Sequence, residues 1–124
     1  MTIAAAASAG NGPPRERTRA EWIAEKRKVE TQSADKDVFG DGTVMMLRAP
    51  GHTPGHSIYV VESQGQQMAF WGDLMHVAAV QFASPAVTIA FDTDSKAAAA
   101  QRQKAYADAA KNGYWVAAAH LSFP

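Results

Sequence analysis

Two proline–glycine pairs within eight residues constrain this chain more than any other feature of its sequence. Residues 49–56 read APGHTPGH, so a histidine follows each pair. Proline restricts its own backbone φ and glycine permits tight turns, and the segment is therefore predicted to form a compact loop. Mainly apolar runs at 43–47 and 57–61 predict strands on both sides of it. The two histidines are thus expected at the edge of a sheet.

Two further potential metal ligands follow strand-like segments later in the chain. A β-hairpin is predicted over residues 57–71 because apolar runs flank a glycine-containing turn, and Asp73 comes directly after it. His120 follows a last predicted strand at 115–119. Imidazole and carboxylate are usual ligands of zinc and similar divalent ions. A Gly-Asp pair alone is common, and a turn can carry solvent-facing histidines, so the prediction of a metal site rests on His56, Asp73 and His120 together.

The clearest helix is predicted over residues 95–112. This stretch is rich in alanine, which has the highest helix propensity, and Gly113 suits the position just past a helix end. Asp94 or Ser95 can cap its first turn. Asp92 and Asp94 are therefore interpreted as capping or turn groups rather than metal ligands.

Three other segments give weaker expectations. Residues 15–31 are charged with a thin apolar stripe and predict a surface helix. Residues 77–82 predict a short strand or a loop lining the site, preceded by His76 as a pocket-wall or surface residue. Phe70, Trp71 and Phe82 are expected in the core.

Composition excludes several classes of protein. A hydrophobic content of 47% is typical of a globular chain. Twelve basic and twelve acidic residues leave no surplus to neutralise phosphates, which argues against a nucleic-acid binder. The absence of cysteine excludes disulfides and thiolate ligands. No apolar stretch reaches the ~20 residues that span a bilayer, and no convincing secretory signal is present, so a cytoplasmic location is expected if Met1 is the true start.

The residues around these candidate ligands resemble the second half of the metallo-β-lactamase superfamily fold, an αββα sandwich. Residues 51–57 are similar to the third metal motif of that family, with the second histidine, His56, as the ligand. Gly72-Asp73 is similar to the fourth motif and His120 to the fifth. Within the superfamily, three segments are similar to methyl parathion hydrolase and its lactonase-like relatives: residues 59–66, 77–82 and 119–124.

This resemblance implies a metal-dependent hydrolase of ester, lactone or phosphotriester bonds. Two divalent ions, expected to be zinc, would share Asp73, which would be both ligand and catalytic residue. His56 would bind one ion and His120 the other, whereas His52 and His76 receive no assigned role. Hydrolysis would proceed by a metal-bound hydroxide, because a divalent ion lowers the pKa of bound water to near 7.

One motif of the family, His-x-His-x-Asp-His, is missing, since none of the four histidines precedes His52. We therefore interpret residues 15–124 as a partial α/β domain of about five strands that lacks the N-terminal half of the sandwich. Residues 1–14, rich in alanine, glycine and proline, are expected to be a disordered leader.

The partial domain has two expected consequences. Each ion would be held by one histidine and a shared carboxylate, whereas catalytic zinc usually has three protein ligands, so weak metal binding and little turnover are expected from the chain alone. A half sheet would also expose an edge and an apolar face, which favours self-association or a complementing N-terminal half as partner. The alternative function is a non-catalytic binding or assembly module that retains half of the fold.

Overall fold

The computed structural model describes residues 18–25 and 30–122, which fall into two units divided between Gln32 and Ser33. In the N-terminal unit, helix α1 (Arg19–Ala24) begins at a capping box. The Thr18 N–H donates to Glu21 Oε2 at 2.8 Å, and the Glu21 N–H donates to Thr18 Oγ1 at 3.3 Å. The helix predicted over residues 15–31 is therefore confirmed over six residues only. Residues 15–17 and 26–29 of that range, and the predicted leader over residues 1–14, lie outside the described residues.

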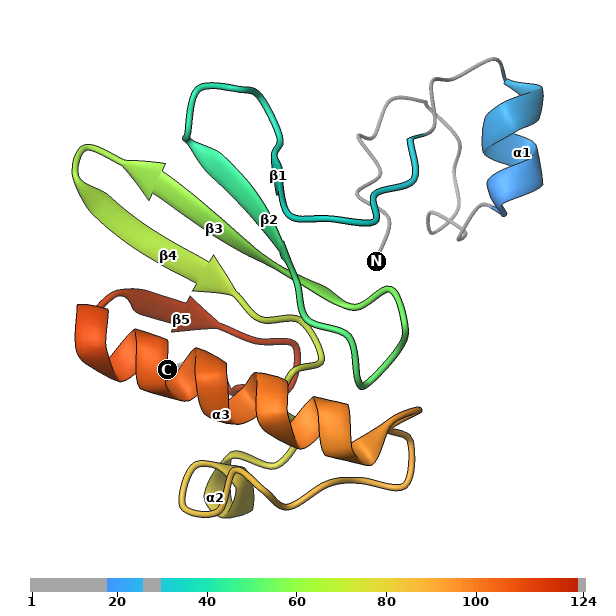
Figure 1. The fold of residues 1–124 in the computed structure, drawn as a ribbon. Helices are drawn as coiled ribbons and strands as arrows, with labels where there is room; N and C mark the ends of the chain where they lie inside the picture. Colours follow the sequence, from blue (N-terminus) through green and yellow to red (C-terminus); the bar gives the residue numbers. More distant parts are fainter. Residues whose placement is uncertain (1–17, 26–29, 123–124) are drawn as a thin grey trace. The chain divides into compact units, whose positions relative to one another are not determined.

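The second unit is built on one mixed sheet whose strands lie in the order in which they occur in the chain (Figure 1). The first three pairings are antiparallel, and the last is parallel. The α/β class and the expected number of strands are therefore confirmed, although the first strand lies in a stretch without a predicted element. The strands are β1 (Lys36–Asp37), β2 (Val44–Arg48), β3 (Ser57–Ser63), β4 (Gln66–Phe70) and β5 (Trp115–Ala117).

A two-residue turn sets the register of the predicted hairpin, β3–β4. Ser63 pairs with Gln66, and the two residues between them, Gln64 and Gly65, have φ of 52° and 75°. Positive φ at both central positions matches the turn to the right-handed twist of the strands. The register places Val60 opposite Ala69, and side chains alternate between the two faces from there.

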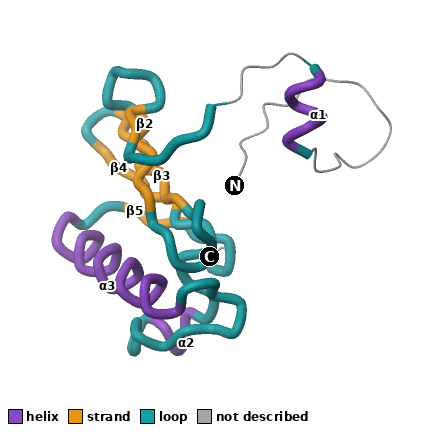
Figure 2. The backbone as a smooth tube through the Cα atoms, turned by 45° about the vertical axis from the view of Figure 1, so that its right-hand side comes forward, coloured by secondary structure: helices purple, strands orange, loops and turns teal. Residues whose placement is uncertain are grey.

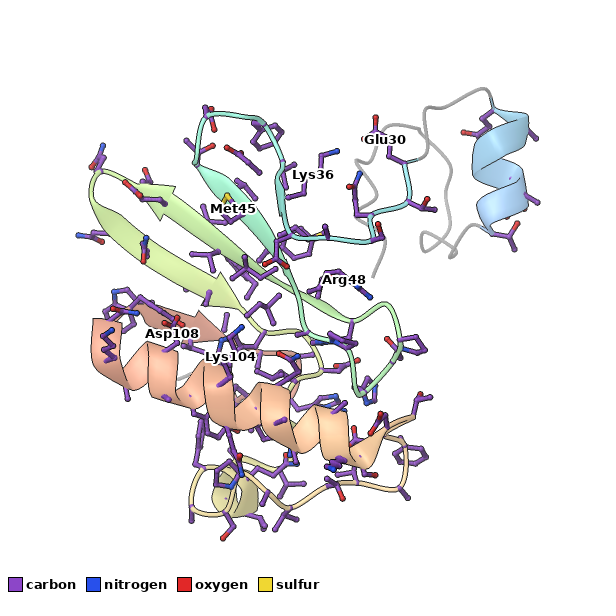
Figure 3. All side chains as sticks on the ribbon, in the orientation of Figure 1. Glu30, Lys36, Met45, Arg48, Lys104 and Asp108 are labelled. Carbon is purple, nitrogen blue, oxygen red and sulfur yellow. The ribbon has the colours of Figure 1, made fainter. Side chains whose placement is uncertain are left out.

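Helix α3 (Ser95–Asn112) has the bounds expected from the sequence. Asp94 is its N-cap and accepts a hydrogen bond from the Ala97 N–H at 2.9 Å, and Gly113 closes the helix with a φ of 68°. Past that end, the Tyr114 hydroxyl donates at 2.7 Å to Asp108, labelled on α3 in Figure 3, which fixes the short turn into β5. Among the described residues, neither α3 nor any other helix is long and apolar enough to cross a bilayer.

The prediction of a strand or loop over residues 77–82 is wrong, because this segment contains a short helix, α2 (Ala78–Gln81). Gln81 explains the difference. Its side-chain oxygen accepts from the His76 and Val77 N–H groups at 2.7 and 3.0 Å, and its amide donates to the Val87 carbonyl at 2.9 Å. A buried amide that satisfies the N–H groups at the start of this turn stabilises it against an extended conformation.

The core lies between α3 and one face of the sheet, and Figure 2 shows the helix running along that side, next to β5. Trp71 is 2% exposed and stacks on Tyr106 of α3 with ring centroids 5.1 Å apart. Full burial of a large apolar side chain contributes about 1.5–3 kcal/mol. Ala105 gives α3 a small side chain at this contact, which allows the helix to approach the sheet closely.

The opposite face of the sheet carries exposed apolar side chains, as expected for a half sheet. Met68 is 37% exposed and Trp115, its partner across β4–β5, is 71% exposed. Phe70 on the same face is also exposed, as is Phe82 beyond α2. The expectation that both phenylalanines pack in the core is therefore wrong, whereas Trp71 is buried as predicted. Phe70 and Trp71 differ in burial because neighbouring residues at the end of β4 face opposite sides of the sheet.

The loop between β2 and β3 packs against the first turn of α3. The Asp94 N–H donates to the Gly51 carbonyl at 2.9 Å, and the Thr93 N–H donates to the His52 carbonyl at 3.0 Å. At Gly51 a Cβ would lie 2.3 Å from the backbone nitrogen of Ala98. Only glycine permits this approach, because a real Cβ would overlap the helix backbone.

Substitution of Gly51 by alanine is expected to destabilise the chain by at least ~1–3 kcal/mol, since loop and helix must separate to admit the methyl group. The measurement is chemical denaturation followed by circular dichroism. Gly55→Ala is the matched control, because a Cβ at Gly55 meets no atom within 4 Å. That control should change the free energy of unfolding by less than ~1 kcal/mol. Equal effects of the two substitutions would contradict the close approach.

Candidate metal centre

Asp73 and His120 meet because the strands that precede them are parallel neighbours. Asp73 follows β4 and His120 follows β5, so both lie beyond the same edge of the sheet. Hydrogen bonds continue past the strand ends, from the Trp71 N–H to the Ala117 carbonyl at 2.7 Å and from the Ala119 N–H to the Gly72 carbonyl at 3.1 Å. His120 Nε2 lies 3.2 Å from Asp73 Oδ1, and both side chains are about half exposed.

His52 reaches the same carboxylate from the loop between β2 and β3. Its Nε2 lies 3.7 Å from Asp73 Oδ2, and its Nδ1 lies 3.1 Å from Asp92 Oδ1. Asp73 therefore has one oxygen facing His120 and the other facing His52. An arrangement of one carboxylate between two imidazoles is suited to hold a divalent ion on each side.

His56, the ligand expected from the sequence, lies beside Asp73 and contacts backbone groups. Its Nδ1 lies 3.0 Å from the Ala49 carbonyl, and its Nε2 accepts the backbone N–H of Asp73 at 3.2 Å. Both ring nitrogens thus contact the backbone, and the residue is buried. Burial lowers the pKa of His56, which favours the neutral ring with its proton on Nδ1. In this geometry the unprotonated nitrogen of His56, Nε2, contacts the backbone of Asp73.

His76 lies between the other imidazoles at the site. Its ring centroid is 4.7 Å from that of His52 and 4.5 Å from that of His120. Its Nδ1 is buried and has no hydrogen-bond partner within the protein. Burial, followed by the nearby charges of His120 and His52, lowers the pKa of His76. The sequence predicted His76 as a pocket-wall or surface residue. The structure places its ring directly beside the candidate ligands.

The donor atoms at this edge fit a divalent transition metal. Within the described residues, two groups have potential ligand atoms within 4.8 Å of one another, and both include His76. Neutral imidazole and carboxylate are the donors that zinc takes, and the lowered pKa of His76 favours its neutral ring. The first group consists of Asp73, His76 and His120, and the second of His52, His76 and Asp92. His52 is therefore a member of one group, and His56 of neither.

The positions of two residues at the site, His52 and Asp92, could not be predicted from the sequence. His52 shares one loop with His56, and only the packing of that loop on α3 determines which ring faces Asp73. Asp92 makes the predicted turn contact, accepting the Ile89 N–H at 3.2 Å, but its fully buried side chain also faces His52. The capping role predicted for Asp94 is confirmed.

The chain is similar to several solved structures that are described as hydrolases or lactonases. AbOPH, a hydrolase of the beta-lactamase superfamily, is 37% identical with a TM-score of 0.72, over 85% of this chain and 35% of its own. The chain has part of the metallo-β-lactamase fold. AidC, a dizinc quorum-quenching lactonase in complex with a product N-hexanoyl-L-homoserine, is 27% identical with a TM-score of 0.70, over 84% of this chain and 34% of its own.

More distant similarity supports the fold alone. A probable metal-dependent hydrolase from Staphylococcus aureus is 22% identical with a TM-score of 0.60, over 70% of this chain and 30% of its own. This chain thus spans about a third of the length of each of these three structures. No protein-family model matches the sequence, and a search of curated proteins gives no match.

The lowered pKa values predict how stability depends on pH. In the unfolded chain His56 and His76 return to the ordinary imidazole pKa of 6.5, so below that value the unfolded state binds more protons than the folded state. The free energy of unfolding of the metal-free chain should therefore decrease as the pH falls from 6.5 through the lower folded pKa values. Denaturant titrations at about pH 8 and about pH 5.5 measure this difference. His76→Gln should reduce it, and an increase in stability toward acid would contradict the assignment.

Proposed function

We propose that this chain carries part of the metal centre of a metal-dependent hydrolase. The observation that carries the proposal is the Asp73 carboxylate, with Oδ1 3.2 Å from His120 and Oδ2 3.7 Å from His52. The similarity to AbOPH and AidC supports a hydrolase of the same fold. Small neutral esters, lactones or phosphotriesters are the proposed substrates, and zinc is the proposed metal. Closer kinship with methyl parathion hydrolase remains a prediction from the sequence.

The proposed ligands from this chain are His56, Asp73 and His120, as the resemblance implies. His56 lies beside Asp73, with its Nε2 3.2 Å from the Asp73 backbone nitrogen. His52 is a further candidate donor, because its Nε2 lies 3.7 Å from Asp73 Oδ2.

The chemistry divides between the metal and the side chains. A divalent ion would lower the pKa of a bound water and polarise the oxygen of a substrate. Asp73 and the neighbouring imidazoles would hold the ions. The 124 residues supply few ligands for each ion, so we expect weak zinc binding and little turnover from this chain alone.

The exposed apolar face of the sheet favours a second candidate function, that of a non-catalytic binding or assembly module. Met68, Phe70 and Trp115 form this face, and exposed apolar patches often mark interaction sites. The two candidates differ in what added polypeptide does. A partial hydrolase gains turnover when the remaining part of the fold is supplied, whereas an assembly module gains a partner without turnover.

Zinc titration by calorimetry and hydrolysis of a phosphotriester and a lactone test the proposal. Asp73→Asn and His120→Ala should each reduce zinc affinity at least as much as the ~10–100-fold that loss of a ligand's hydrogen-bond partner costs, because each removes a donor that the chain cannot replace. Glu62→Gln, which changes an exposed carboxylate on β3, is the matched control and should leave zinc binding unchanged.

Complementation distinguishes the two candidate functions. Addition of the segment of AbOPH that this chain does not cover should restore turnover with the unsubstituted chain and not with Asp73→Asn. Zinc binding unaffected by Asp73→Asn would contradict the metal centre. Complex formation without any turnover would favour the assembly module.

A further inference from the structure

The sheet of the second unit has one face covered by α3 and an open face on its other side. Val60, Ala69 and Val116 point into the core beside the helix. Figure 2 shows α3 running along that covered side. Because neighbouring residues of a strand point to opposite sides, the residues next to these three belong to the open face. The open face therefore carries the exposed rings of Phe70 and Trp115.

The register of the sheet arranges the open face into two apolar rows, each of which crosses four strands from β2 to β5. Residues paired across neighbouring strands lie side by side on the same face, so each row is continuous. The first row consists of Val44, Val61, Met68 and Trp115, and the second of Met46, Tyr59, Phe70 and Ala117. These eight side chains carry no charge. Lys36 of β1 extends the second row at the edge of the sheet.

Polar residues border the two apolar rows at both ends of the strands. Arg48 pairs with Ser57 beyond one row, and Ser63 pairs with Gln66 beyond the other. An apolar centre inside a polar rim is the usual anatomy of a protein–protein interface. Single exposed apolar residues are normal on a protein surface, whereas a continuous apolar patch marks an interaction site.

Charge and area both favour a second copy of this chain as the partner of the open face. Twelve basic and twelve acidic residues give a net charge of zero, and a net charge near zero promotes association between copies. At the ~150–250 Å² that an aromatic side chain can bury, Trp115 and Phe70 leave ~200–300 Å² uncovered in each copy. Two copies, with the rest of both rows, approach the ~1,000 Å² that a weak specific interface needs.

We propose that two copies of this chain form a weak symmetric dimer, in which the apolar rows of one open face pack on those of the other. A two-fold contact uses the same residues of both copies. Two packed sheets keep their strand directions within about 30° of each other, which allows both rows to interdigitate. The dimer then has four layers, with α3 of each copy on the outside. The proposed metal centre plays no part in this contact, so the dimer and the hydrolase are tested separately.

The first experiment is sedimentation velocity of the full chain with a metal chelator, over ~5–500 μM. The sedimentation coefficient should rise with concentration toward that of a dimer. Trp115→Lys should weaken the dimer at least ~10-fold, because it places a charge within the contact. Phe39→Lys is the matched control, since Phe39 is also 71% exposed but lies between β1 and β2, and it should leave the dimer unchanged. A chain that is monomeric throughout, or equal effects of the two substitutions in folded variants, would overturn the proposal.

The second experiment identifies the face that forms the contact. The chain contains no cysteine, so one introduced thiol reports on one position. Met68 and Gln67 are neighbours on β4 that face opposite sides of the sheet. A short bifunctional thiol reagent should join two copies of Met68→Cys at least ~10-fold faster than two copies of Gln67→Cys, because the dimer raises the local thiol concentration. Equal rates would contradict the open face as the contact.

Two other occupants of the open face give different results. A monomeric chain in which Met68→Cys is protected from thiol reagents would show that another segment of the same chain covers the face. A monomeric chain that binds the segment of AbOPH outside the region of similarity would assign the face to the remaining part of the fold. Either result would overturn the dimer.

Discussion

The architecture around the candidate site depends on one buried guanidinium. Arg102 lies on α3, whose other buried residues are alanines. Its guanidinium donates hydrogen bonds to carbonyls of the segment between β4 and α3, which has little regular structure. Burial of this charge is tolerated because three carbonyls and the Asp92 carboxylate surround it. Replacement by an apolar residue would leave those groups unpaired. The helix therefore stabilises the connection between β4 and α3 by polar contacts as well as by packing.

The site combines contributions from three regions of the chain. Asp73 and His120 follow parallel neighbouring strands, and His52 arrives on a loop that rests on the first turn of α3 through Gly51. His56 lies beneath Asp73 and satisfies its N–H. The half-exposed carboxylate of Asp73 is thus positioned by the buried ring of His56. Because the loop that carries His52 rests on α3, small shifts of that helix would change the distance between His52 and Asp73.

Local physics made much of the fold predictable. The hairpin turn, the alanine-rich helix and its Asp94 cap are encoded within short segments, and the structure has all three. The edge positions of Asp73 and His120 followed from strand patterns and from family resemblance. The helix α2 was missed because Gln81, whose amide stabilises its first turn, has no signature distinct from that of any other polar residue.

The partners of the two loop histidines were not predictable in the same way. His52 and His56 follow identical Pro-Gly pairs, so sequence alone does not distinguish the ring that faces Asp73 from the ring that contacts the backbone. That difference arises from the close approach of Gly51 to α3 and from Asp92, a residue forty positions further along the chain. Long-range contacts of this kind have no periodicity and no local propensity.

The mixed sheet has a consequence for the order of folding. The pairings among strands β1 to β4 join segments that are close in sequence, and they close short loops at low entropic cost. The parallel pairing of β4 with β5 must instead close a loop that contains α2 and α3. Contacts between distant segments form slowly, so we expect the antiparallel meander to form first and β5 to dock later. His120 would then reach Asp73 only in that last step, and assembly of the site would coincide with completion of the sheet.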